Sequence, residues 1–173
     1  MTVTKSESAR MTTAAEAAFR IDAPNSQPRN VKVIALDGPS ERVVKHLATR
    51  EWNRATFLTA SAFDTSPGAA QPFSMQGWLK DLAGRTKSLV DEIDTADLVV
   101  MIAASGENAH AAALVGEACS LKHVMTTALI LGSDATTDEA LSKSLTQLRP
   151  HVMMLVISNA DEYIEDMLAA LRA

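Results

Sequence analysis

Residues 97–108 read Asp97-Leu98-Val99-Val100-Met101-Ile102-Ala103-Ala104 followed by Ser105-Gly106-Glu107-Asn108, and this run is the clearest fold signal in the chain. Its unbroken apolar half is typical of a strand that is covered on both faces of a sheet. The small polar residues end the strand, and an alanine-rich stretch with helical spacing follows at about 108–121. A strand, a small loop and a helix N-terminus form the place where α/β proteins seat an anionic ligand. The run therefore predicts an α/β fold with a ligand-binding loop at 104–108.

Apolar runs alternate with amphipathic stretches along the rest of the chain, as expected for βαβ units around a parallel sheet. Five strands are predicted, at 31–36, 55–60, 98–103, 124–131 and 152–158. Helices are predicted at about 40–51 and 108–121, and after the capping pairs Thr136 with Glu139 and Asn159 with Glu162. A further helix is predicted where apolar residues recur at helical spacing, at Leu79, Leu82, Leu89, Val90 and Ile93.

Right-handed crossovers between parallel strands leave few arrangements for five such units. The simplest is a three-layer, doubly wound parallel sheet of about five strands in the Rossmann/flavodoxin-like order 2-1-3-4-5. The first and third strands are then neighbours, and ligands of open α/β sheets bind outside the carboxyl ends of such a pair. The loops Asp37-Gly38-Pro39-Ser40 and 104–108 both open into that crevice. The candidate ligand-binding residues in these loops are Gly38, Ser40, Ser105, Gly106, Glu107 and Asn108.

The length and composition suit one compact domain, because 173 residues with 47% hydrophobic content can bury a sizeable core. We assign this single domain to residues 31–173. Residues 1–30 are rich in Ser, Thr and Ala and predict a flexible N-terminal arm with one short helix at 13–20; an organelle transit peptide is the alternative. The segment 61–77 contains Pro67, Gly68 and Pro72 and predicts a lid or a disordered loop.

The charge and the cysteine content limit the partners and the compartment. A net charge of −5, without any run of Lys and Arg, argues against nucleic acid or an acidic membrane surface as the partner. The single cysteine, Cys119, cannot form an internal disulfide and is expected to be a buried, inert thiol. No apolar segment reaches the roughly 20 residues that span a bilayer, so we expect a cytoplasmic protein.

The order of these pieces resembles the nucleotide-binding half of the FtsZ/tubulin family. In that family a strand like Val31-Lys32-Val33-Ile34 leads into a glycine-rich loop, and a segment like 96–104 leads into the loop that cradles the phosphates. An alanine-rich helix and a strand like Thr127-Ala128-Leu129-Ile130-Leu131 follow, and 148–159 is similar to the family segment that ends in a guanine-contacting Asn. The resemblance covers about residues 30–173. It implies a site for GTP or GDP with Mg²⁺, with Asn159 as the base contact.

The chain departs from that family in the phosphate loop. Where the family has a GGGTGTG run, this chain has Ser105-Gly106-Glu107-Asn108-Ala109-His110-Ala111, and Glu107 adds a carboxylate. Asp37 and Glu41 add the same sign of charge beside the other loop. The chain also lacks the family's catalytic acidic loop and second domain, so we expect no GTP hydrolysis. The prediction is a degenerate domain that binds a nucleotide or a small phosphorylated ligand, or a non-catalytic subunit of an assembly with a protein partner or with itself.

A second resemblance points to a different function. Residues 97–108 are similar to the phosphosugar-binding segment of sugar isomerase domains, in which a strand ends on Ser-Gly-Glu or Ser-Gly-Asn. This resemblance implies isomerase or lyase chemistry with Glu107 or His110 as the proton carrier. The four histidines are scattered without metal-ligand spacing, so no metal site is expected.

Overall fold

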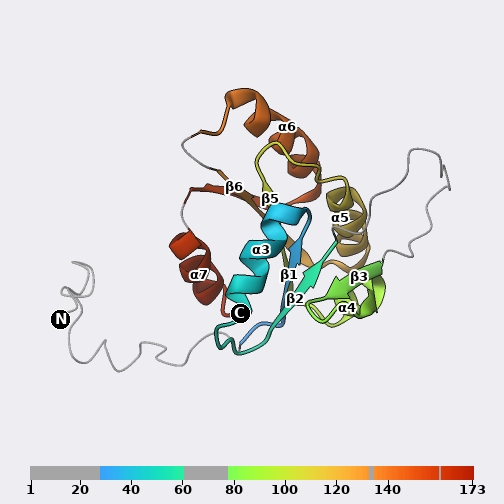
Figure 1. Ribbon diagram of the computed structural model, residues 1–173. Helices are drawn as coiled ribbons and strands as arrows, with labels where there is room; N and C mark the ends of the chain where they lie inside the picture. Colours follow the sequence, from blue (N-terminus) through green and yellow to red (C-terminus); the bar gives the residue numbers. More distant parts are fainter. Residues whose placement is uncertain (1–27, 61–77, 133–134, 160) are drawn as a thin grey trace, which may run out of the picture.

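The computed structural model describes residues 28–60, 78–132, 135–159 and 161–173 (Figure 1). The predicted helix at 13–20, nearly all of the predicted N-terminal arm, and the predicted lid or disordered loop at 61–77 lie outside these residues. Within them the chain folds around one seven-stranded mixed sheet with the order β4-β3-β2-β1-β5-β6-β7. The α/β class predicted from the sequence is confirmed.

Five strands of the sheet are parallel and correspond to the five predicted strands. They are β1 (Val31–Ala35), β2 (Ala55–Thr59), β5 (Leu98–Ala104), β6 (Met125–Leu131) and β7 (Met154–Ser158). β1 pairs with β2 on one side and with β5 on the other, so it lies in the middle of the sheet. Both of its faces are covered, which explains why β5 is apolar throughout and why β1 is apolar except for Lys32.

The predicted count of about five strands is wrong, and so is the complete strand order. Two short antiparallel strands, β3 (Trp78–Asp81) and β4 (Thr86–Ser88), form a hairpin that extends the sheet beyond β2. We predicted a helix over this stretch from the spacing of its apolar residues. The turn overrides that spacing, because Gly84 adopts φ +80° and the Asp81 carboxylate accepts hydrogen bonds from the backbone N–H groups of Ala83 and Arg85. Only the end of the predicted helix remains, as a short helix that the Ser88 side chain caps.

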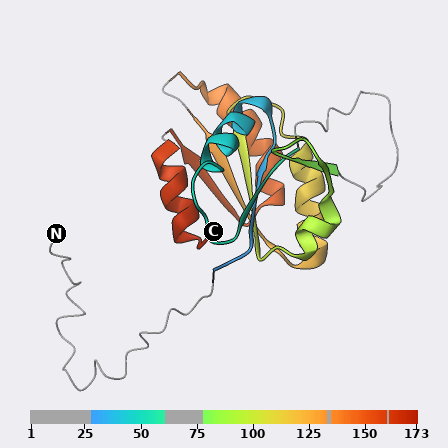
Figure 2. The same ribbon diagram turned by 60° about the horizontal axis from the view of Figure 1, so that its bottom comes forward.

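Helices cover both faces of the sheet (Figures 1 and 2). They are α3 (Gly38–Leu47), α4 (Leu89–Asp94), α5 (Ala111–Lys122), α6 (Asp138–Leu148) and α7 (Asp161–Ala170), with a 3-10 turn, η1 (Arg149–His151), after α6. One apolar cluster joins the sheet to α4, α5 and α6, and a second joins it to α3 and α7. The predicted cap of α6 shifts by one residue, because Thr137 and not Thr136 accepts the hydrogen bond from Ala140 N–H.

One charged side chain is buried in the face of the sheet beneath α4. Lys32 on β1 is 5% exposed, and its Nζ atom lies 2.8 Å from Glu92 Oε2 and 3.3 Å from Thr56 Oγ1. A buried ammonium group needs such partners, because its desolvation is otherwise costly. In the part of the chain that the structure describes, no helix is long and apolar enough to cross a membrane.

Candidate functional site

The carboxyl ends of β1 and β5 lie side by side and bring the two predicted loops together. The strands are in register with Ala35 opposite Ile102, and their helices, α3 and α5, lie on opposite faces of the sheet. This is the position at which open α/β sheets usually bind ligands. The structure therefore brings six of the predicted site residues to the carboxyl ends of β1 and β5, namely Gly38, Ser40, Ser105, Gly106, Glu107 and Asn108.

Asp37 ties the two loops to each other. Its Oδ1 atom accepts a hydrogen bond of 2.8 Å from Ser40 N–H, and its Oδ2 atom accepts one of 2.8 Å from Ala104 N–H. Burial raises the pKa of the Asp37 carboxyl above its ordinary value, and the negative charge of Glu107 adds to the rise, while the two amide hydrogen bonds oppose it. Asp37 thus acts as an N-cap and as a cross-link between β1 and β5.

Ser40 and Gly38 differ in how open they are to a ligand. Ser40 is fully buried, and its hydroxyl group exchanges hydrogen bonds with the Asp37 backbone in a capping box. Gly38 faces open space, since a Cβ atom there would meet no other atom within 4 Å. Of the two, only Gly38 adjoins free room for a ligand.

The loop at 105–110 is fastened to α6. Gly106 N–H donates a 2.8 Å hydrogen bond to Ser144 Oγ, and Lys143 Nζ donates one of 2.8 Å to the Gly106 carbonyl. Ala109 N–H donates a 2.9 Å hydrogen bond to Gln147 Oε1. Two backbone N–H groups that would help to cradle a phosphate, those of Gly106 and Ala109, are thus already engaged by side chains of α6.

Two further contacts keep the loop close to its neighbours. Gly106 adopts φ +83°, and a Cβ atom on it would lie 3.0 Å from Ala140 Cβ, so glycine is needed for the close approach of α6. Asn108 Oδ1 accepts a 3.0 Å hydrogen bond from His110 N–H, and α5 begins only at Ala111. The Asn108 side chain therefore serves the start of α5.

Ser105 has the one unsatisfied buried side-chain atom among the described residues. Its Oγ atom is buried and has no hydrogen-bond partner there, although its N–H donates to the Leu131 carbonyl at 2.9 Å. A buried hydroxyl without a partner costs about 1–3 kcal/mol. The Ser105 hydroxyl could therefore still accept or donate a hydrogen bond to a bound group.

Asn159 lies apart from the other predicted residues. It follows β7, two strands away from β5, which corresponds to about 10 Å at the usual strand spacing. Its Oδ1 atom fills the space beside Gly132, where a Cβ atom would approach it to 2.4 Å. Asn159 therefore also lies at the carboxyl ends of the strands, but beside β6 and β7 and not beside β1 and β5. In residues 28–60, 78–132, 135–159 and 161–173, no group of three or more His, Cys, Asp or Glu side chains could hold a metal ion.

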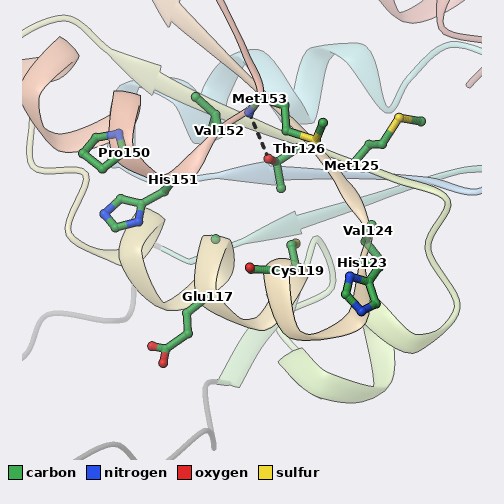
Figure 3. Close-up of a pocket in the computed structure, with 12 residues that line it drawn as sticks. Glu117, Cys119, His123, Val124, Met125, Thr126, Pro150, His151, Val152 and Met153 are labelled. Carbon is green, nitrogen blue, oxygen red and sulfur yellow. Dashed lines mark hydrogen bonds between the residues drawn. The ribbon is translucent and has the colours of Figure 1, made fainter.

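A hollow of about 630 Å³ opens at the opposite end of the sheet (Figure 3). It lies between α5, the start of β6 and the segment before β7. The apolar residues of its lining are Cys119, Val124, Met125, Pro150, Val152 and Met153. Burial raises the pKa of the Cys119 thiol to about 12, and Thr126 Oγ1 accepts a 3.2 Å hydrogen bond from Met153 N–H. The Cys119 thiol in this hollow is therefore not ionised at neutral pH.

The outer strand β7 was not among the predicted functional features. Met154 and Ile157 on this strand are 42% and 46% exposed, and Met153 just before it is 78% exposed. A signal for this surface was present in the sequence, because 152–157 is an uncharged apolar run in the strand that the predicted order places at an edge.

The sequence matches no protein-family model and no curated protein. Fold and site define the class of the protein as an α/β domain with a mixed sheet and a loop at the carboxyl end of β5 that is tied to α6.

Proposed function

We propose that this chain is a non-catalytic α/β subunit that acts by binding another protein along β7. One observation carries the proposal: β7 pairs only with β6 among the described strands, and it exposes Met154 and Ile157. Natural edge strands are usually protected by charges, prolines or bulges against pairing with another chain. The run 152–157 carries no charged residue, which is typical of a strand that is covered in an assembly.

The closed loop at 105–110 supports the non-catalytic part of this proposal. A nucleotide phosphate would have to displace Ser144 and Gln147 from the backbone amides that they occupy. It would also approach the carboxylates of Asp37 and Glu107, which requires a cation to offset the repulsion.

The test uses the full chain, purified under native conditions from cells that make it, and measures its mass by sedimentation and native mass spectrometry. We expect the 18.5 kDa chain in a larger complex. Ile157→Lys should release the chain as a monomer, because a lysine on an edge strand opposes pairing. Leu82→Lys is the matched control, since Leu82 is an exposed apolar residue at the opposite edge of the sheet. A wild-type chain that is monomeric and free of other proteins would refute the proposal.

A second candidate function is the binding of a small phosphorylated ligand at the crevice, and the unpartnered Ser105 hydroxyl favours it. The candidate ligands are GTP or GDP with Mg²⁺, as the resemblance to the FtsZ/tubulin family implies, or a phosphosugar, as the resemblance to sugar isomerase domains implies. The five adjacent parallel strands, with helices on both faces, support a doubly wound, Rossmann/flavodoxin-like relationship.

Thermal shift with these ligands, with and without Mg²⁺, tests the second candidate, because a ligand that binds only the folded state raises the melting temperature. Ser105→Ala should abolish a rise that depends on the crevice. Isomerase or lyase chemistry would further require that Glu107→Gln lose turnover of the phosphosugar. No rise with any of these ligands would reject this candidate.

A further inference from the structure

We infer that the partner along β7 is a second copy of this chain, and that the two β7 strands pair antiparallel about a twofold axis. This inference rests on the proposed function, because it names the partner of the same surface. It follows from three properties of the sheet among the described residues: the difference between its two outer strands, the direction of the β7 backbone groups, and the charge of β7.

The two outer strands of the described sheet are unlike each other. β4 has three residues, includes Lys87, and follows the exposed Arg85. β7 has five residues and is uncharged. A short strand with basic side chains is a poor template for pairing, so β4 of one copy is not suited to meet β7 of another. A contact of β7 with β7 remains, and a contact between identical surfaces closes as a twofold dimer.

The direction of the backbone groups restricts how the two strands align. Gly132 N–H donates a 2.9 Å hydrogen bond to the Ser158 carbonyl, so Ser158 directs its carbonyl group toward β6. Because the direction alternates along a strand, Leu155 and Ile157 direct their backbone groups to the free edge. In an antiparallel pair, residues whose backbone groups point outward must lie opposite each other. The twofold axis therefore passes through a residue, because an axis between two residues would place an outward residue opposite an inward one.

An axis at Val156 satisfies this condition and pairs all five residues of β7. Leu155 then lies opposite Ile157 of the second copy as a hydrogen-bonded pair, and Val156 lies opposite its own copy as a non-hydrogen-bonded pair. The side chains of Leu155, Val156 and Ile157 thus meet apolar side chains of the second copy, and Met154 lies opposite Ser158. The exposed Ile157 becomes covered, which removes apolar surface from water.

The charge of the strand fits a second copy better than a charged partner. Residues 152–158 carry no ionised side chain, although the chain as a whole has a net charge of −5. The two β7 strands therefore meet without like charges between them, and the net charge of the two copies opposes the contact at longer range. Salt screens that repulsion, so we expect the dimer to tighten as ionic strength rises.

Disulfide trapping in a Cys119→Ala background tests the register. Val156→Cys should form a dimer of twice 18.5 kDa on mild oxidation, because non-hydrogen-bonded antiparallel partners have Cα atoms about 4.5 Å apart, within disulfide range. Met154→Cys is the matched control. Its partner would be Ser158 of the second copy, so it should not cross-link to itself although Met154 is more exposed than Val156. The double variant Met154→Cys/Ser158→Cys should cross-link again. It tests the same register without changing Val156, in case Val156→Cys does not fold.

The outcomes separate this inference from the proposed function. Cross-linking of Val156→Cys and of the double variant, but not of Met154→Cys, supports the twofold pairing. Cross-linking of Met154→Cys alone refutes it. A purified chain that is monomeric by itself, but is bound to a different protein that Ile157→Lys releases, refutes the second copy and retains the proposed function. A wild-type chain that binds no protein at all refutes both.

Discussion

The Oδ2 atom of Asp37 lies 2.8 Å from the backbone nitrogen of Ala104, so one buried carboxylate joins the end of β1 to the end of β5. The residues are 67 positions apart in sequence. Because the other oxygen of Asp37 caps α3, the same side chain sets the position of the helix and of the two loops at the crevice.

Asp37→Asn should lower the free energy of unfolding by about 1–3 kcal/mol, because an amide has one acceptor oxygen and would leave Ser40 N–H or Ala104 N–H unpaired. Urea unfolding at neutral pH measures the loss. Asp166→Asn, which changes an exposed carboxylate on α7, is the control and should be nearly neutral. Equal stability of Asp37→Asn and the wild type would show that the cross-link is dispensable.

The raised pKa of Asp37 predicts the direction in which the stability of the fold changes with pH. A group whose folded-state pKa lies above its unfolded value of 3.8 stabilises the fold below that value, and the contribution is lost as the pH rises through the folded-state pKa. The stability of the wild type relative to Asp37→Asn should therefore fall with rising pH in the acid range. Urea unfolding of both proteins over that range measures it. An advantage of the wild type that grows with pH would indicate a lowered pKa.

Gly106 and Gly38 should respond differently to alanine. Gly106→Ala should cost about 1–2 kcal/mol, because the left-handed backbone at φ +83° disfavours a side chain and the new Cβ would crowd Ala140. Gly38→Ala should cost little, since no atom lies within 4 Å of its Cβ position. Thermal unfolding of the two variants gives the comparison. A larger loss from Gly38→Ala would contradict the loop geometry.

The buried pair Lys32 and Glu92 should be sensitive to which partner is removed. Glu92→Gln leaves the Lys32 ammonium buried without its counter-charge and should cost about 3 kcal/mol. Lys32→Met removes the buried charge itself and should cost less, because Glu92 is the more exposed partner and can be hydrated. Denaturant unfolding of both variants shows which substitution lowers the free energy of unfolding more. A larger loss from Lys32→Met would show that the unpaired Glu92 carboxylate is the more costly of the two.

Cys119 should be unreactive in the folded protein. Its thiol is buried and its pKa is about 12, so at pH 8 almost none of it is thiolate. An aromatic disulfide reagent should label it only as fast as the protein unfolds. Ser120→Cys in a Cys119→Ala background is the control, because Ser120 is exposed on the same helix and should react at once. Rapid labelling of Cys119 in the native protein would show that its helix opens locally.

The sequence by itself determined the α/β class and the five parallel strands, because continuous apolar runs and capping residues are local signals that burial and helix formation require. It did not determine the β3–β4 hairpin, whose apolar residues fit a helical period until the Asp81 turn is known. Only the tertiary structure decided that α6 occupies the amides of the 105–110 loop and that Asp37 reaches Ala104. These contacts join residues 38 and 67 positions apart, and no local spacing rule reports them. The exposure of β7 falls between the two: its apolar run is visible in the sequence and the predicted order places it at an edge, but the exposure of Met154 and Ile157 depends on how the helices cover the sheet.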